Sequence, residues 1–255
     1  MAIQSSASRL VLLTGLVAGL AACAGRGGDR QPDPVIDAMA RQAALAAENS
    51  HDYEAAAGNW TMLFQRHPDD AAIALALARD LRHAGRLQPA IDVVAPFIER
   101  HGPSPALLAE LGKDYLAADR LGLAERTLRQ AAEAGPKDWQ VLSALGVTLD
   151  YQGNHAQAQE IYSRALALSP DNPVILNNLG LSQAQAGQLN EAKTTLRRAA
   201  DQPAATAQTR QNLALVEALS GDPEMAERLA RQDLSPEMVR ANAAYFKLLA
   251  GALKP

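Results

Sequence analysis

The sequence is poor in cysteine, in aromatic residues and in clustered charge. Its 255 residues contain one cysteine, Cys23, so no internal disulfide can form. Aromatic residues make up 4% of the chain, and no segment alternates apolar and polar residues as a half-buried strand does. The 24 basic and 28 acidic residues are interspersed. Without a block of lysine or arginine, the sequence predicts no nucleic-acid partner.

Motifs for catalysis and for metal binding are also missing. No P-loop and no G-x-S-x-G elbow occurs, and no two histidines stand four residues apart. The pair Asp69-Asp70 and the Asp171-Asn172 turn precede expected helices, where acids favour the helix dipole, so we interpret both as caps. We expect no enzyme activity, no cofactor and no metal, and we expect solvated or capping roles for five histidines: His51, His67, His83, His101 and His155.

The lone cysteine ends an apolar run near the N-terminus. Residues 1–9 are mostly polar with one positive charge, residues 10–20 are apolar except for one threonine, and small residues lead to Cys23. This is the pattern of a secretory signal peptide. A helix over residues 10–23 would rise about 21 Å, against about 30 Å of hydrocarbon in a bilayer. A polar, glycine-rich segment follows, so a signal peptide explains the run better than a transmembrane helix does.

The four residues Leu20-Ala21-Ala22-Cys23 resemble the bacterial lipobox. The resemblance implies cleavage before Cys23 and acylation of its thiol and of its new amino group, and two acyl chains hold a protein on a membrane stably. Ala24 stands where inner-membrane lipoproteins commonly have aspartate, which implies the periplasmic face of the outer membrane. We therefore expect a signal peptide at 1–22, a lipidated flexible tether at 23–34 and a folded domain at 35–255.

A 34-residue period organises that domain. The pattern Leu111-Gly112, Ala124 and Leu128 recurs at Leu145-Gly146, Ala158 and Tyr162, and again at Leu179-Gly180, Ala192 and Leu196. Six copies begin, without insertions, near Asp37, Ala71, Pro105, Trp139, Pro173 and Ala207. The pattern resembles the tetratricopeptide repeat, a helix–turn–helix unit. It predicts an all-α solenoid of about six repeats with a C-terminal capping helix.

Particular positions predict local structure within the repeats. Gly112, Gly146 and Gly180 should let the two helices of one repeat approach closely, and four glycines should end first helices in a left-handed conformation: Gly85, Gly153, Gly187 and Gly221. Pro96 should kink or shorten the second helix of copy two. A final helix over residues 236–252 should cover the open end of the stack through Met238, Ala241, Tyr245, Leu248 and Leu249.

In such solenoids the concave wall is built from the first helix of each repeat. The predicted wall begins basic and becomes apolar with amides, which suits an extended or helical protein segment. Asparagine at positions 178 and 212 is ordinary in this repeat family and can serve the fold alone. The predicted peptide groove consists of Arg79, Arg82, Lys113, Val147, Tyr151, Asn177, Asn178, Leu181, Gln185, Gln211, Asn212 and Leu215.

The C-terminal third is similar to the TadD family, lipoproteins of the tight-adherence (Flp/Tad) pilus assembly machinery. The matching pieces are the segment 209–215, the turn at Gly221, the segment 226–230, Asp233-Leu234 and the segment 242–249. The resemblance implies an outer-membrane lipoprotein that helps to assemble or localise the pilus secretin. Its partners would be segments of the secretin or of other assembly subunits. A general cell-envelope adaptor that recruits peptidoglycan or outer-membrane assembly factors is an alternative compatible with the same sequence.

Overall fold

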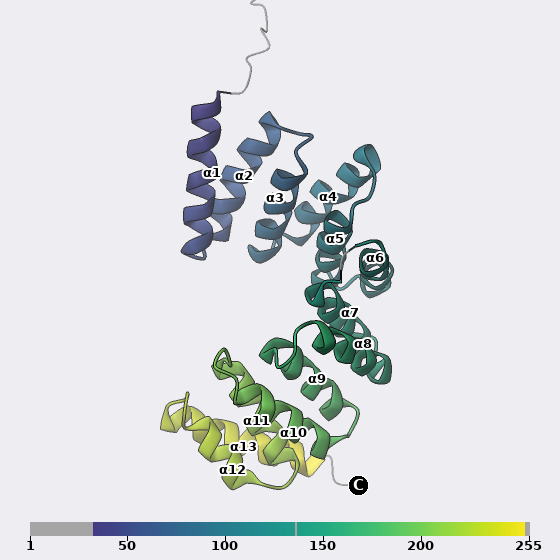
Figure 1. The fold of residues 1–255 in the computed structure, drawn as a ribbon. Helices are drawn as coiled ribbons and strands as arrows, with labels where there is room; N and C mark the ends of the chain where they lie inside the picture. Colours follow the sequence, from purple (N-terminus) through teal and green to yellow (C-terminus); the bar gives the residue numbers. More distant parts are fainter. Residues whose placement is uncertain (1–32, 136, 253–255) are drawn as a thin grey trace, which may run out of the picture.

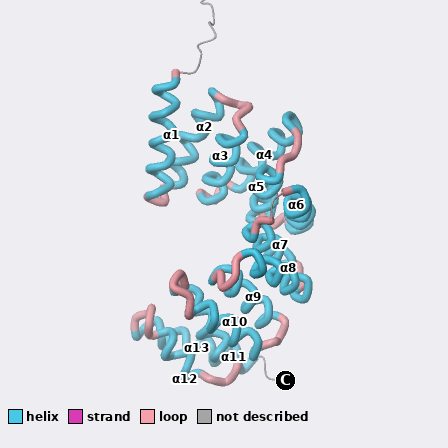
Figure 2. The backbone as a smooth tube through the Cα atoms, viewed as in Figure 1, coloured by secondary structure: helices cyan, strands magenta, loops and turns pink. Residues whose placement is uncertain are grey.

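The computed structural model describes residues 33–135 and 137–252, so the predicted signal peptide, Cys23 and nearly all of the tether lie outside the described residues. The described ranges hold only helices and the turns and loops that connect them (Figures 1 and 2). The helices are α1 (Pro34–Asn49), α2 (Tyr53–Arg66), α3 (Ala71–His83), α4 (Leu87–His101), α5 (Pro105–Ala117), α6 (Leu121–Ala134), α7 (Trp139–Tyr151), α8 (His155–Leu168), α9 (Pro173–Gln185), α10 (Leu189–Ala200), α11 (Ala207–Leu219), α12 (Pro223–Ala230) and α13 (Pro236–Ala252).

Consecutive helices pair into six hairpins that stack into an arc. From α3 onward each first helix also packs on the first helix of the next hairpin, as α3 does on α5 and α5 on α7. The first helices of copies two to six begin at the predicted residues. The helix of the first copy begins at Pro34, three residues before the predicted start, because Asp33 caps it by accepting a hydrogen bond from the Val35 amide at 2.9 Å. The predicted all-α solenoid is confirmed.

The predicted close approaches within hairpins are also confirmed. A Cβ at Gly112 or at Gly180 would lie 2.6 Å from Leu128 Cγ or Leu196 Cγ, and one at Gly146 would lie 2.5 Å from the ring of Tyr162. Because real Cβ atoms do not come this close to their neighbours, only glycine allows the second helix its position at these three places.

One position of the repeat is left-handed in all six copies. The four predicted turn glycines have positive φ, and so do His51 (59°) and Asp119 (56°), which stand 34 residues away from glycines in the same register. The geometry of the turn is thus a property of the repeat, and it persists where the residue is not glycine.

The second helix of copy two is not shortened as one prediction allowed, and the phase predicted for the last helix is wrong. Pro96 lies inside α4, which at 15 residues is not shortened. The carbonyl that loses its partner belongs to the solvent-exposed Asp92, and Val94 and Phe97 are buried on the opposite side and hold the helix in place. Among the α13 side chains that the structure describes, which end at Phe246, Val239 and Phe246 are buried, one residue out of phase with the exposed Met238 and Tyr245. The predicted Leu248 and Leu249 side chains lie outside the described part.

The capping roles predicted for the residues before α3 and α9 are confirmed for one residue of each pair. Asp70 and Asn172 accept amide hydrogen bonds as predicted, whereas the preceding acids do not cap: Asp69 pairs with His101 at 3.1 Å, and Asp171 pairs with Arg198 at 2.6 Å. In the part of the chain that the structure describes, no helix is long and apolar enough to cross a membrane.

Candidate protein-binding groove

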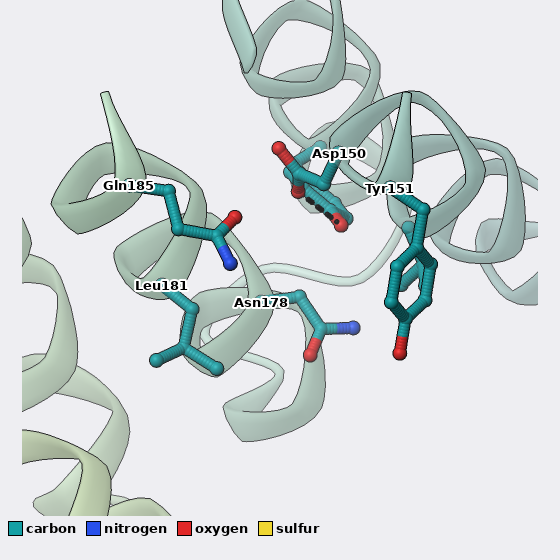
Figure 3. A pocket seen from close by; sticks show the side chains of 7 residues that line it. Asp150, Tyr151, Asn178, Leu181 and Gln185 are labelled. Carbon is teal, nitrogen blue, oxygen red and sulfur yellow. Dashed lines mark hydrogen bonds between the residues drawn. The ribbon is translucent and has the colours of Figure 1, made fainter. Parts of the chain in front are cut away.

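Two adjoining hollows lie along the first helices in the middle of the stack. They share Val147 and Tyr151 of α7, so we treat them as one groove. The hollow toward the C-terminus is completed by Asp150, Tyr162, Asn178, Leu181 and Gln185 (Figure 3). The hollow toward the N-terminus is completed by Arg82, Lys113, Leu116, Ala117 and Asp119.

Tyr151 is the most prominent residue of the groove. It is the last residue of α7, and 70% of its surface is exposed. Figure 3 shows its ring standing apart from Asn178 and Leu181 of the neighbouring helix. A tyrosine left exposed between two hollows offers a large apolar area with a polar tip, which is the type of side chain that anchors protein interfaces.

The floor of the C-terminal hollow is held by Asp150. Its carboxylate accepts hydrogen bonds from Ser182 at 2.6 Å and from Tyr162 at 2.9 Å, and His155 lies 2.9 Å away. Burial and the nearby carboxylate raise the pKa of Tyr162, so this phenol stays protonated and donates. Ser182 and His155 both contact the carboxylate, and no hydrogen bond among the described residues joins the histidine to the serine. The cluster therefore fixes the position of α9 against α7.

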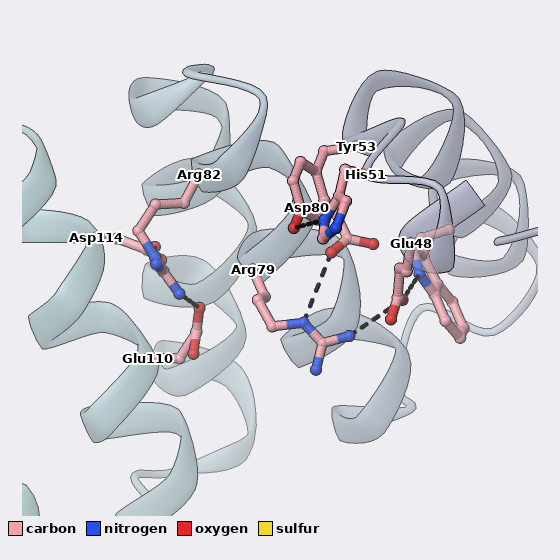
Figure 4. Close-up of polar contacts among 9 residues, drawn as sticks. Glu48, His51, Tyr53, Arg79, Asp80, Arg82, Glu110 and Asp114 are labelled. Atoms are coloured by element: carbon pink, nitrogen blue, oxygen red, sulfur yellow. Dashed lines mark hydrogen bonds and ion pairs between the residues drawn. The ribbon is translucent and has the colours of Figure 1, made fainter. Parts of the chain in front are cut away.

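The basic end of the predicted wall is largely neutralised by ion pairs (Figure 4). Arg82 donates to Glu110 at 2.7 Å and to Asp114 at 2.9 Å, across to the next first helix. Burial raises the pKa of Asp114 to about 7, with the charge of Glu110 as a second cause and Arg82 opposing both. Arg82 thus lines the groove while its charge is compensated.

Arg79 is occupied in the same way on the other side of α3. It donates to Glu48 at 3.1 Å and lies 3.6 Å from Asp80, which is wholly buried (Figure 4). Burial first, and the charge of Glu48 second, raise the pKa of Asp80 to about 6. Among the described residues, no carboxylate lies within ion-pair distance of Lys113, so Lys113 is the cation that the groove offers to a partner.

Most amides of the predicted wall already bind other side chains of the protein. Asn212 donates to Asn177 at 2.8 Å, and Asn178 donates to Ser143 at 3.3 Å, so both contacts link a repeat to the one before it. Gln211 donates to Asp233 at 3.4 Å. The sequence left a purely structural role open for Asn178 and Asn212. Asn212 has such a role, with Asn177 as its partner, whereas Asn178 both links two repeats and lines the groove.

The groove contains these predicted wall residues: Arg82, Lys113, Val147, Tyr151, Asn178, Leu181 and Gln185. The structure places the others outside it, with Leu215 packed against the end cluster of Ala218 and Phe246. Five groove residues were not predicted from the sequence: Leu116, Ala117, Asp119, Asp150 and Tyr162. Asp150 could have been predicted, because it stands two periods after Arg82 in the same repeat position.

Comparisons with known proteins agree with this architecture. Two sequence models described as tetratricopeptide repeat match residues 41–101 with 110–173 and residues 151–214. The protein y4yS of Sinorhizobium fredii, described as uncharacterized, is 32% identical over 91 residues, which are 36% of this chain and 50% of y4yS. The chain thus aligns with about half the length of this relative.

Solved structures show the same fold. PilW, titled a widely conserved type IV pilus biogenesis factor, superposes with a TM-score of 0.68 at 16% identity, over 79% of this chain and 93% of PilW. YrrB, titled a TPR protein with an unusual peptide-binding site, gives a TM-score of 0.54 at 19% identity, over 73% of this chain and 97% of YrrB. With helix hairpins at a 34-residue period throughout the described residues and sequence matches over most of them, the chain belongs to the tetratricopeptide-repeat family.

Proposed function

We propose that this protein is a non-enzymatic scaffold on the periplasmic face of the outer membrane. A lipid on Cys23 would anchor it, and its groove would hold a segment of a secretin or of another subunit during Flp/Tad pilus assembly. The observation that carries the binding role is the groove around Tyr151, where an exposed aromatic ring separates two hollows.

The groove has the chemistry to bind a polypeptide segment. Val147, Leu181 and the ring of Tyr151 offer apolar surface to one or two side chains of such a segment. The amides of Asn178 and Gln185 can pair with its peptide groups, and Lys113 can pair with an acidic residue beside them. The order along the groove predicts a segment with an acid toward α5 and apolar residues toward α9.

The pilus role rests on likeness. The C-terminal third resembles the TadD family, the lipobox fits a lipoprotein, and the fold resembles that of PilW, which is described as a type IV pilus biogenesis factor. An anchored scaffold promotes assembly by raising the local concentration of the parts that it holds.

The test combines gene deletion with a matched pair of tyrosine variants. We expect deletion to remove surface pili and to lower the amount of assembled secretin. Complementation with Tyr151→Ala should fail, whereas Tyr245→Ala should restore pili, because Tyr245 is 59% exposed on α13 away from the groove. Normal pili and normal secretin in the deletion strain would reject the pilus role.

The anchor is tested separately from the groove. Mass analysis of the native protein should show an acylated N-terminal Cys23, and Cys23→Ser should move the protein from the membrane to the soluble fraction. An unmodified N-terminus on the membrane-bound protein would refute lipidation while leaving the groove experiment valid.

A further inference from the structure

The two ends of the solenoid are finished differently. At the C-terminal end α13 packs on α11 and α12 and buries Val239 and Phe246. At the N-terminal end α1 is the outermost helix and packs on α2 (Figure 1). One side of α1 is exposed along its length, and we call it the open face: Val35, Ala38, Met39, Gln42, Ala43 and Ala46.

The repeat period shows what normally covers this face. Met39 is 66% exposed, yet the residues one to five periods later are buried: Ile73, Leu107, Val141, Ile175 and Thr209. Ala46 is exposed, and its buried counterparts are Asp80, Asp114, Thr148, Ser182 and Val216. In every later copy the preceding hairpin covers these positions. The open face therefore has the geometry of a helix-packing surface that lacks its helix.

The charged residues of α1 lie away from the open face, and this indicates what kind of surface could pack on it. Asp37 pairs with Arg66, Arg41 lies over the ring of Trp60, and Glu48 accepts from Trp60 at 3.0 Å, so these charges point toward α2. The open face itself is uncharged, and its alanines allow close approach of a second helix. A protein surface that binds lipid headgroups usually carries basic residues. The open face has none, and the residue at its N-terminal border, Asp33, is acidic.

We propose that the open face is a homodimer contact, in which α1 of one copy packs antiparallel against α1 of a second copy. A two-fold axis near Gln42 brings an uncharged face against an identical one and sets the two helix dipoles in opposition. α1 has 16 residues, so the two Pro34 residues would stand about 24 Å apart. Residues 23–33 span up to about 36 Å, so both chains reach one membrane if Cys23 carries the lipid.

Cysteine crosslinking in native membranes tests the contact on the full chain. Gln42→Cys lies beside the proposed axis, and Gln130→Cys, an exposed glutamine on α6, is the matched control. Mild oxidation should link Gln42→Cys into a dimer in several-fold higher yield than the control. The parent chain, with Cys23 alone, should give no dimer.

Charge variants test the antiparallel register. In this packing residue 39 of one copy faces residue 46 of the other. Met39→Glu and Ala46→Lys alone should each lower the yield of the Gln42→Cys dimer several-fold, because each inserts an unpaired charge. The double variant should restore it, because each introduced carboxylate then meets an introduced ammonium group of the other copy. Both sites are exposed, so the fold of one copy should be unchanged by circular dichroism.

The outcomes separate this contact from the proposed function. If the parent chain itself forms dimers, Cys23 is free and the anchor fails, and the comparison is repeated in the Cys23→Ser background at equal protein concentration. A Gln42→Cys yield no higher than that of Gln130→Cys, linkage of Gln42→Cys to a different protein, or failure of the double variant to restore the dimer would each overturn the dimer. Loss of pili alone would not support it.

Discussion

The first helices of the N-terminal and C-terminal halves meet through different chemistry at the same repeat positions. Asp80 and Asp114 are wholly buried carboxyl groups in α3 and α5, and the next two positions of the series in α7 and α9 are the buried hydroxyls Thr148 and Ser182. Arg82 bridges α3 to α5, whereas in α7 its counterpart is Asp150, which accepts a hydrogen bond from α9. The two contacts join the same pair of repeat positions. In the N-terminal half Arg82 donates to the next first helix, whereas in the C-terminal half Asp150 accepts from it.

The two halves differ in their turns as well. The three C-terminal hairpins place glycine at the left-handed position, whereas the N-terminal half has His51 and Asp119 there in two hairpins of three. The N-terminal half is thus more ionic and more strained, although its backbone follows the same repeat. The repeat therefore determines the backbone geometry of every copy. The side chains at equivalent positions differ, so the stability of each copy should depend differently on pH and on substitution.

The largest expected effect comes from removing the ionic bridge. Arg82→Met leaves Glu110 and Asp114 buried without a counterion, which should lower the free energy of unfolding by about 3–5 kcal/mol. Urea denaturation and hydrogen exchange of α3 and α5 measure it. In the C-terminal half, Thr148→Val loses one hydrogen bond within its helix and should cost about 1 kcal/mol. If Arg82→Met and Thr148→Val lowered the free energy of unfolding equally, the ionic contacts of the N-terminal half would not differ in strength from the hydroxyl contacts of the C-terminal half.

A smaller effect is expected where helices approach over glycine. Gly146→Ala places a Cβ against the rigid ring of Tyr162 and should cost about 1–3 kcal/mol. Gly112→Ala meets Leu128, whose side chain can change rotamer, so its cost should be smaller. Thermal denaturation of the two variants side by side gives the ratio, and a larger cost at Gly112 would contradict the argument.

The ionic half should also respond to pH. Because the pKa of Asp114 is about 7 in the folded protein and lower in the unfolded chain, the folded state holds more protons between those values. The free energy of unfolding should therefore fall as pH rises, by up to about 1.4 kcal/mol per pH unit, or about 2 kcal/mol from pH 5.5 to pH 7. Asp114→Asn should flatten this slope, and an unchanged slope would show that Asp114 does not titrate there.

The smallest effect concerns the turns. Asp119→Gly relieves a left-handed aspartate and should stabilise the protein by about 0.5–1 kcal/mol, and the converse change Gly153→Asp should destabilise it by a similar amount. Denaturation midpoints of the pair measure both. Effects of the same sign would show that the two turns are not equivalent.

The repeat itself could be predicted from sequence because its signals are local. Ser104 before Pro105 marks a helix start, and Gly146 marks a close approach, so hairpin boundaries follow without knowledge of their neighbours. The phase of α13 could not be predicted in this way. Val239 and Phe246 repeat at the same interval as Met238 and Tyr245, and only the fit against α11 and α12 decides which pair is buried.

The groove could be predicted only in part, because the sequence shows which residues share a helix face but not which residues of other hairpins contact them. Helical spacing places Val147, Tyr151 and Leu181 on the inner wall. The same spacing suggested that Arg79 and Arg82 are available to a ligand, but their partners come from other hairpins: Glu48 stands 31 residues before Arg79, and Glu110 stands 28 residues after Arg82. The residue spacing within one helix cannot predict such contacts, because they depend on how two helices are aligned side by side.

The position of the groove has a mechanical consequence. Tension between the start of α1 and a segment held around Tyr151 would run through α1 to α7, where interlocking ion pairs resist sliding of one helix past the next. The hairpins from α10 to α13 lie beyond that line and would carry no load. A pulling experiment along this direction should stretch the hairpins between α1 and the groove and leave those beyond the groove folded.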